Sequence, residues 1–402
     1  MGTDRRRLDD CIDAAYAPEV SVVCRYRHAF SSGAPDEDAA FRQALLDTSI
    51  REGARIFPLL SFRGVELHVL DESSLMQTGT LKSIDGCLTA AKCRLRGDRR
   101  VVFESGGNTG TALTEYGRKA GLETFCVVPE ESVALLDSRV FEPASAHLIA
   151  VADAGLVKAS ARLFRGLNGI RHIPEVAWRY EASRFRGCLI LEHSMRCGGF
   201  DWLVQTISAA FGPIGIYDVL QGFEPGPGRI PRFLGIQQEA NCPMYQAWTS
   251  ATRELSEDAP EPKRGGELLT RVMYDVAPHT YGTYQDLKGV LEATRGDLCT
   301  INHAEFFGLF DQRFDGKSLL DLLEDNGARI GTSGGEVIER TGLIALAGAL
   351  KAISNGRVAR GSKVLCCLTS GTRPGDGKAV PDYRVADLDR VLEDCQRMIH
   401  GA

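Results

Sequence analysis

The sequence contains no uninterrupted apolar segment approaching the roughly 18 residues that a membrane-spanning helix requires. Its beginning, MGTDRRRLDDCIDAAYAPEV, lacks the apolar core of a secretion signal. Arg6 stands where a myristoylation motif needs serine or threonine. We therefore expect a protein without a membrane partner, located in the cytoplasm.

Basic residues are not in excess, because 47 lysines and arginines stand against 53 aspartates and glutamates, a formal net charge of -6 at pH 7. A general nucleic-acid binder usually carries a basic excess, so we expect no nucleic-acid partner. The net charge does not argue against a small anionic ligand, because a few local arginines can bind one inside an acidic protein.

No Cys-x-x-Cys or His-x-x-x-His pair occurs among the 12 cysteines and 8 histidines. The spacing predicts no metal site, and in a cytoplasmic protein we expect mostly reduced thiols. The adjacent Cys366 and Cys367 lie in the apolar stretch KVLCCLTS, which predicts a buried strand.

From about residue 82 onward, strand-like and helix-like segments alternate along the chain. Strands that recur with helices between them indicate a parallel sheet with crossover helices, and so an α/β fold. The predicted helices are 82–96, 111–121, 132–138, 216–223, 339–356 and 387–399. The predicted strands are 101–104, 123–129, 146–152, 202–212, 228–240 and 363–369, and residues 256–266 are predicted to form a solvated loop.

Two short stretches contain residues that could react with or bind a ligand. In residues 78–82, TGTLK, a polar turn presents Lys82 at the start of a predicted helix. Residues 105–110, SGGNTG, join a predicted strand to a helix, so their N–H groups and the positive helix end can bind a carboxylate or phosphate. A plain turn is the alternative. A Walker nucleotide site is excluded, because Thr111 and Ala112 follow the last glycine.

Together, Lys82 in TGTLK and Asn108 in SGGNTG resemble the fold-type II pyridoxal-phosphate enzymes, which include threonine synthase, cysteine synthase and cysteate synthase. The resemblance implies that Lys82 forms a Schiff base with pyridoxal 5′-phosphate and that Asn108 contacts the 3′-oxygen of this cofactor. The similar region spans roughly residues 65–375. The residues that the resemblance assigns to the substrate carboxylate are Ser105, Gly106, Gly107 and Thr109.

Later segments match the superfamily in the expected order. Residues 211–223, FGPIGIYDVLQGF, resemble its phosphate loop and following helix, and we expect this helix to begin near Gly215. Residues 364–371, VLCCLTSG, resemble the strand whose Thr369 meets the pyridine nitrogen. Pro213 has no N–H group to offer the phosphate. The backbone donors expected for the phosphate are Gly212, Ile214, Gly215 and Ile216, unless side chains take part.

Within the superfamily, cysteate synthase is the closest comparison, on the stretches 278–306 and 179–192. The second stretch includes Arg184 and Arg186, which we expect to bind a sulfonate or phosphate of the substrate. Surface ion pairs are the alternative for both arginines. His303 can line the site, although a hydrogen-bonded structural histidine is the more frequent case.

The resemblance implies a two-domain fold-type II enzyme, like the β-subunit of tryptophan synthase, with open, mostly parallel sheets and helices on both faces. Residues 1–94 and 186–402 are expected to form the larger, cofactor-binding domain. Residues 95–185 are expected to form a smaller, mobile α/β domain that carries the asparagine loop. The family also implies a homodimer.

The implied activity is β-elimination or β-replacement on an acidic amino acid, such as exchange of the phosphate of phosphoserine for sulfite in sulfonate or coenzyme M biosynthesis. Lys82 would remove the α-proton, and the cofactor would stabilise the carbanion. The alternatives are threonine synthase, a cysteine synthase or desulfhydrase, and a non-catalytic binding subunit, against which Lys82 and Asn108 argue. Departures from the superfamily at Leu81, Ser83 and 340–342 favour an altered substrate or reaction.

Overall fold

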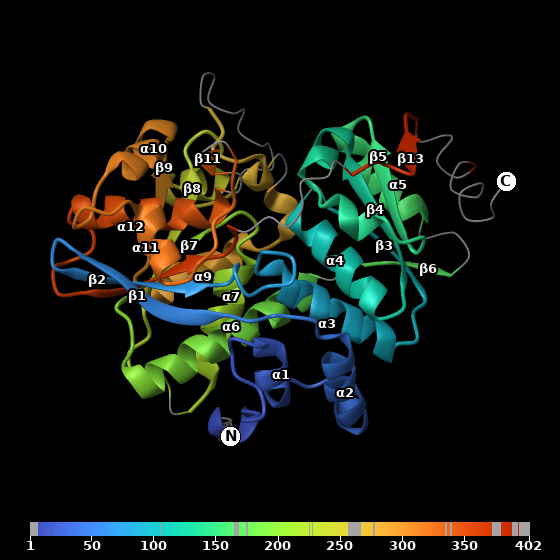
Figure 1. The fold of residues 1–402 in the computed structure, drawn as a ribbon, viewed down its shortest axis with the longest axis horizontal. Coiled ribbons are helices and arrows are strands. Elements are labelled where there is room, and N and C mark those ends of the chain that lie inside the picture. Colours follow the sequence, from blue (N-terminus) through green and yellow to red (C-terminus); the bar gives the residue numbers. More distant parts are fainter. Residues whose placement is uncertain are drawn as a thin grey trace.

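The computed structural model describes residues 7–105, 107–164, 169–173, 176–224, 226, 228–255, 267–275, 278–333, 336–337, 340–371, 379–387 and 393. Two large sheets lie at the centres of two lobes that stand side by side (Figure 1). Most strands are parallel and helices flank them, which confirms the predicted α/β fold. Within the described part of the chain, no helix is long and apolar enough to cross a membrane.

The larger sheet has six strands in the order β1-β2-β12-β7-β8-β9. β1 and β2 form an antiparallel hairpin, which was not predicted, and both residues of its turn, Arg63 and Gly64, have positive φ (50° and 76°). The other neighbouring strands are parallel, as crossover connections require. The strands are β1 (Arg55–Phe62), β2 (Val65–Asp71), β7 (Trp202–Thr206), β8 (Arg232–Gln238), β9 (Asp297–Ile301) and β12 (Lys363–Leu368).

The smaller sheet has five parallel strands in the order β13-β5-β4-β3-β6. β13 comes from the C-terminal part of the chain, so the prediction that all of residues 186–402 belong to the larger domain is wrong for this strand. The open edge of β5 accepts it, and the Asp382 carboxylate fixes the pairing by accepting the Leu148 amide at 2.8 Å. The strands are β3 (Arg100–Glu104), β4 (Glu123–Pro129), β5 (Ala146–Val151), β6 (Ile170–His172) and β13 (Tyr383–Val385).

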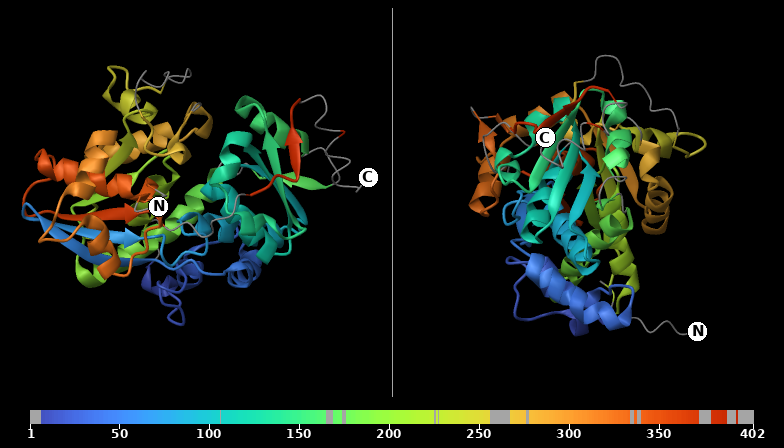
Figure 2. Two further views of the ribbon diagram at one scale, coloured as in Figure 1. Left: turned by 45° about the horizontal axis from the view of Figure 1, so that its top comes forward. Right: turned by 90° about the vertical axis from the view of Figure 1, so that its right-hand side faces the viewer.

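Helices surround both sheets, and α1 and α2 lie at the foot of the molecule (Figures 1 and 2). α6 follows β6 of the smaller sheet and precedes β7 of the larger sheet, so it connects the two lobes. A separate two-stranded ribbon consists of β10 (Thr332–Ser333) and β11 (Glu336–Val337). The helices are α1 (Val22–Tyr26), α2 (Asp38–Thr48), α3 (Lys82–Leu95), α4 (Asn108–Lys119), α5 (Val157–Phe164), α6 (Val176–Cys197), α7 (Phe211–Gly222), α8 (Pro243–Thr249), α9 (Tyr284–Thr294), α10 (His303–Asp311), α11 (Leu319–Asp325) and α12 (Thr341–Ser354).

An apolar cluster covers each face of the larger sheet, because successive side chains of a strand point to opposite sides. In β12, Cys367 packs into one cluster and Cys366 into the other. The predicted buried strand is therefore confirmed, and burial raises the pKa of both thiols. α12 lies so close to the second face that a Cβ atom at Gly348 would lie 2.4 Å from the Ile236 side chain.

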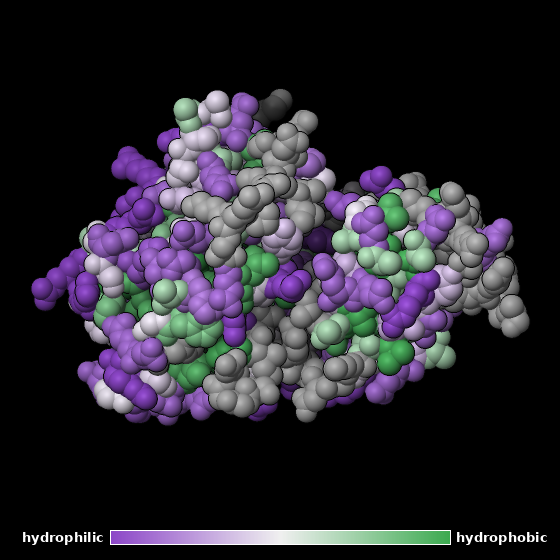
Figure 3. Space-filling view, turned by 90° about the horizontal axis from the view of Figure 1, so that it is seen from above, coloured by the Kyte–Doolittle hydropathy of each residue, from purple (hydrophilic) through white to green (hydrophobic). Residues whose placement is uncertain are grey.

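β2, β12 and β7 run parallel, so their carboxyl ends lie at the same edge of the larger sheet. From above, the surface is hollowed between the two lobes, with polar side chains on the rim (Figure 3). The loops that follow these strands carry most of the residues considered below. The predicted loop 256–266 lies outside the described residues, and so does almost all of the predicted helix 387–399.

Candidate cofactor and substrate site

Lys82 is the first residue of α3, and the tight turn before it fixes its position. Gly79 has a φ of +68°, a backbone conformation that favours glycine. The Leu81 amide donates to the carbonyl oxygen of Thr369 at 2.9 Å. The predicted helix start is confirmed, and the turn brings Lys82 to the end of β12.

The ammonium group of Lys82 lies 2.8 Å from Oδ2 of Asp85, one turn further along α3. The Lys82 side chain is one-quarter exposed, whereas the Asp85 side chain is buried. The pair therefore joins a partly exposed ammonium group to a buried carboxylate. Asp85 was not predicted, although two side chains three residues apart on a helix share one face.

The asparagine loop lies between β3 and α4, where the sequence placed it. The Ser105 hydroxyl accepts the Gly110 amide at 2.9 Å and so satisfies one N–H group of the first turn of α4. Asn108 and Thr109 are the first two residues of the helix and are half-buried, so they stand at its positive end. Gly106 lies outside the described residues.

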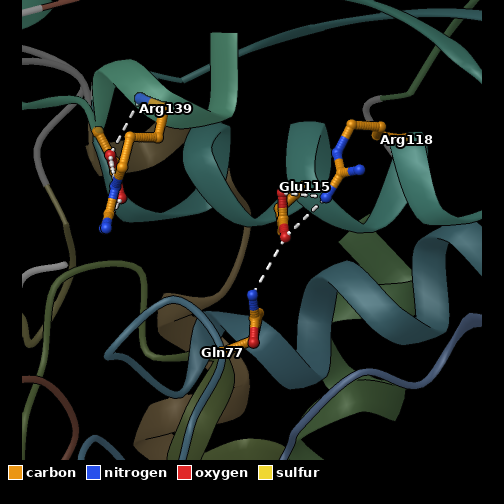
Figure 4. A network of polar contacts seen from close by, with 5 residues as sticks. Gln77, Glu115, Arg118 and Arg139 are labelled. Carbon is orange, nitrogen blue, oxygen red and sulfur yellow. Dashed lines mark hydrogen bonds and ion pairs between the residues drawn. The ribbon is translucent and has the colours of Figure 1, made fainter. Parts of the chain in front are cut away.

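Contacts between the lobes join the lysine turn to α4 (Figure 4). Gln77, in the turn, donates to Glu115 of α4 at 3.1 Å, and Glu115 also pairs with Arg118. The Tyr116 hydroxyl donates to the buried carboxylate of Glu52 at 2.6 Å, and burial raises the pKa of Tyr116. In this structure, these bonds connect α4, which begins at the asparagine loop, to the lysine turn and to Glu52.

The helix expected to begin near Gly215 begins instead at Phe211, so that prediction is wrong. The apolar residues 202–212 do not form one long strand, because β7 stops early and the chain turns into α7. The amides of Ile214, Gly215 and Ile216 therefore lie beyond the first three residues of a helix. They donate within α7 and are not free for an anion.

The backbone donors to consider are those of the loop 208–210 and of the first turn of α7, because the Ile207 amide already donates to the Ile236 carbonyl oxygen at 2.9 Å. Ala210 precedes the helix with a left-handed φ of +58°, and N–H groups of a first helical turn lack helical acceptors. Pro213 is the third residue of α7, where its missing N–H group costs no helical bond. A Cβ atom at Gly212 would lie 2.4 Å from the Gln205 side-chain nitrogen. Sequence reasoning missed the loop because it contains no glycine.

A buried carboxylate anchors this loop. The Ser208 hydroxyl donates to Oδ2 of Asp275 at 2.6 Å, and the Tyr281 hydroxyl donates to Oδ1 at 2.8 Å. The Asp275 backbone amide donates to the Asn241 side chain at 2.8 Å. Burial raises the pKa of the Asp275 carboxyl, and the two hydroxyl donors oppose that rise.

Two hydroxyl side chains at the end of β12 can meet a pyridine nitrogen. Thr369 is the predicted residue, and Ser370 follows it; both are buried. The Ser370 hydroxyl has no hydrogen-bond partner within the described part of the chain, and sequence reasoning did not single it out. A Cβ atom at Gly342 would lie 2.1 Å from the Ser370 carbonyl oxygen, so glycine there lets α12 pack against this strand end.

The two predicted arginines both lie on α6, but their side chains have different surroundings and different partners. Arg184 pairs with Asp218 of α7 at 2.9 Å on the surface, so the structure does not place it at the site. Arg186 is fully buried, and Glu72 accepts two hydrogen bonds from it at 2.5 and 2.6 Å. Burial raises the pKa of Glu72, and the guanidinium of Arg186 opposes that rise. His303, at the start of α10, pairs with an exposed glutamate.

A third arginine of α6, Arg179, was not predicted. Its guanidinium lies 5.5 Å from the centroid of the Phe211 ring, beside the start of α7. Burial raises the pKa of Tyr281, and the positive charge of Arg179 opposes that rise. Arg179 belongs to the same matched stretch as the predicted arginines. The stretch therefore pointed to this helix without distinguishing among its arginines.

These residues fit pyridoxal 5′-phosphate. The first turn of α7 offers N–H groups to a phosphate, and Gly212 places no side chain beside them. Lys82 is partly exposed for bonding to an aldehyde, and Ser370 has an unused hydroxyl for the ring nitrogen. Among the described residues, no group of three or more His, Cys, Asp or Glu side chains is arranged to hold a metal ion.

No family model matches the sequence. Cysteate synthase of Methanospirillum hungatei is 24% identical over 320 residues, 76% of this chain and 69% of that protein. Cysteate synthase of Methanosarcina barkeri is 24% identical over 336 residues, 80% of this chain and 74% of that protein.

Solved structures share the fold. Threonine deaminase isoform 2 of Solanum lycopersicum has a TM-score of 0.59 at 10% identity and covers 85% of this chain and 91% of its own. Cysteine synthase of Entamoeba histolytica has a TM-score of 0.53 at 13% identity and covers 87% and 95%. These matches confirm the predicted fold, and the sequence matches confirm the predicted resemblance to the cysteate synthase branch.

Proposed function

We propose that this chain, a fold-type II pyridoxal-phosphate enzyme of the threonine synthase and cysteate synthase branch, catalyses β-replacement on an acidic amino acid. In the cysteate-synthase-like reaction, the β-carbon of phosphoserine loses its bond to the phosphate oxygen and gains a bond to the sulfur of sulfite. The observation that carries the proposal is that the residue before Lys82 is hydrogen-bonded to the end of β12, whose neighbour β7 leads into α7 at the same edge of the larger sheet.

Each part of this site has a task in such a reaction. The cofactor, when bound, serves as an electron sink for the α-carbanion of an amino acid. The Nζ atom of Lys82, as a neutral amine, takes the α-proton, and Asp85 at 2.8 Å orients this nitrogen and pairs with the ammonium that results. The asparagine loop binds the substrate carboxylate through the positive end of α4. A neutral hydroxyl at the end of β12, from Thr369 or Ser370, leaves the ring nitrogen largely unprotonated, which favours elimination and replacement over transamination.

An acidic substrate needs a cation near its second anionic group, because burial of an unpaired oxyanion costs several kcal/mol. We assign this part to Arg179 in place of Arg184 and Arg186, which are engaged with Asp218 and Glu72. Arg179 is half-buried and lies over the Phe211 ring, with no carboxylate ion pair among the described contacts. Its planar guanidinium suits a phosphate or sulfonate.

The experiment is an assay of the purified protein, supplied with pyridoxal 5′-phosphate, against L-phosphoserine with and without sulfite. We expect phosphate release and cysteate formation that require sulfite, and no turnover by Lys82→Ala. Threonine formed from phosphohomoserine, or sulfide released from cysteine, would replace the proposal with threonine synthase or desulfhydrase activity. Inactivity on every substrate, without cofactor binding, would favour a non-catalytic binding subunit.

The proposal includes a homodimer in the cytoplasm and a smaller domain that moves relative to the larger one. Light scattering by the purified protein tests the first point, since a dimer has about twice the mass of the 43.8 kDa chain. A monomer at all concentrations used in the assay would contradict it. Solution scattering with and without substrate tests the domain movement, which is expected to reduce the radius of gyration.

A further inference from the structure

One nitrogen of the buried Arg186 side chain has no hydrogen-bonded nitrogen or oxygen acceptor among the described residues, although the guanidinium also interacts with the thiol of Cys367. The Nε and Nη2 atoms donate to Glu72 at 2.5 and 2.6 Å, and Nη2 also donates to Gln205 at 2.8 Å. Nη1 is buried and makes no hydrogen bond to a nitrogen or oxygen atom of any described residue. A buried N–H donor of a charged group costs free energy when it has no acceptor. A ligand that accepts a hydrogen bond from this nitrogen would remove that cost.

Nη1 is directed to the first turn of α7. A Cβ atom at Gly212 would lie 2.6 Å from it, so only the missing side chain lets the guanidinium approach the backbone here. The next residue, Pro213, has no N–H group. The first turn of α7 therefore lacks one backbone N–H donor, at Pro213. Nη1 of Arg186, a donor without a nitrogen or oxygen acceptor among the described residues, lies beside this turn.

We propose that Nη1 of Arg186 donates a hydrogen bond to the phosphate group of the cofactor, in place of an amide at residue 213. Glu72 and Gln205 are positioning residues, because they hold the other two nitrogens of the guanidinium. A guanidinium-to-phosphate bond is charge-assisted and stronger than a neutral one. The inference rests on the proposed function, and it changes the part of Arg186 from a substrate contact to a cofactor contact.

The test compares two ligands that differ only in the phosphate, pyridoxal 5′-phosphate and pyridoxal, by equilibrium titration of the cofactor-free protein. The test variant is Arg186→Gln combined with Glu72→Gln, because removing both charges leaves neither buried alone. The control is Arg184→Gln, which removes a surface arginine of the same helix. Far-UV circular dichroism and thermal unfolding without ligand report whether each variant folds.

We expect the double variant to bind pyridoxal 5′-phosphate about 10-fold or more weakly, with pyridoxal binding unchanged, as the loss of one charge-assisted bond implies. The control is expected to bind both ligands as the unaltered protein does. Equal weakening of both ligands, or no weakening of either, would overturn the inference. Arg186→Lys, which keeps a cation opposite Glu72, takes the place of the double variant if the latter does not fold.

The outcome is separable from that of the proposed function. If the unaltered protein binds neither ligand at Lys82, the proposed function fails and this inference with it. If it binds both ligands equally well, the phosphate has no site at α7, and this inference alone is overturned. If the unaltered protein turns over phosphoserine but the double variant does not lose affinity selectively for pyridoxal 5′-phosphate, the proposed function is retained and only this inference is rejected.

Discussion

The amide nitrogen of Leu81 lies 2.9 Å from the carbonyl oxygen of Thr369, to which it donates a hydrogen bond. The bond ties the residue before Lys82 to the end of β12, although the two segments are far apart in sequence. Because the bond is made by the backbone, it does not depend on which side chain stands at position 81. The lysine turn and the hydroxyls near the ring nitrogen thus form one corner of the site.

Asp85→Asn is expected to lower turnover while the protein keeps its cofactor. The Asp85 carboxylate orients the Lys82 ammonium at 2.8 Å, and asparagine replaces a charge-assisted contact with a weaker one. We expect kcat to fall by about 10-fold or more, with cofactor content unchanged, because the loss of such a bond is worth roughly 1.5–3 kcal/mol. Steady-state kinetics and cofactor absorbance provide the measurement. An unchanged kcat would mean that Asp85 has no part in placing the lysine.

Gly342→Ala is expected to destabilise the protein and weaken cofactor binding. The added Cβ would lie 2.1 Å from the Ser370 carbonyl oxygen, so α12 or the end of β12 must shift. Overpacking of this kind costs about 1–3 kcal/mol. Thermal unfolding and cofactor titration provide the measurement.

The matched control for this variant is Gly289→Ala. Gly289 lies within α9, and its added Cβ would meet no atom within 4 Å. Replacing a helical glycine by alanine should raise stability by up to about 1 kcal/mol. Equal effects of the two variants, of either sign, would contradict the close packing of Gly342 against Ser370.

Gly212→Ala and Gly215→Ala separate the corrected phosphate site from the one predicted by sequence. At Gly212 the Cβ would lie 2.4 Å from the Gln205 side chain, beside the first turn of α7, whereas at Gly215 it would lie 2.3 Å from the Tyr180 carbonyl oxygen of α6. Both variants should lose stability. The ratio of pyridoxal affinity to pyridoxal 5′-phosphate affinity should change for Gly212→Ala alone. A change confined to Gly215→Ala would restore the later helix start as the phosphate site.

Much of the fold was accessible from the sequence because strand and helix periods alternate clearly. Residues 82–96, 123–129 and 363–369 were predicted within a residue or two of α3, β4 and β12. The exact end of β7 was not, because residues 202–212 are apolar in both the strand and the helix that follows. Hydrophobicity cannot separate two buried elements that join without a polar turn.

The candidate site was only partly predictable for a related reason. Lys82 and Asn108 occur in local patterns, a turn and a helix start, which a single sequence displays. Partners such as Asp275, or the orphan nitrogen of Arg186, depend on segments that meet only in the folded chain. The C-terminal strand β13 was missed for the same reason. A segment of three residues is too short to show the alternation of a strand, and its pairing with β5 depends on the folded chain.

The Asp275 carboxyl predicts a specific dependence of stability on pH. Burial raises its pKa from 3.8, so the folded state favours the protonated form. The stability that this proton provides is full below pH 3.8 and is lost as the pH rises through the raised pKa. Asp275→Asn removes the titration but keeps an amide opposite Ser208. The unfolding temperature of the unaltered protein relative to this variant should therefore fall as the pH rises from 4 to 7. A constant difference would contradict the expectation.

The most direct test of the account is to locate the cofactor on the chain. The purified protein is incubated with pyridoxal 5′-phosphate, reduced with borohydride to make the lysine bond permanent, digested, and its peptides are weighed by mass spectrometry. We expect Lys82 to carry the pyridoxyl phosphate, and we expect the absorbance of the lysine-bound cofactor, at roughly 410–430 nm for this chemistry, to be absent in Lys82→Ala. A cofactor found on Lys92 or Lys119, or on no lysine, would contradict it.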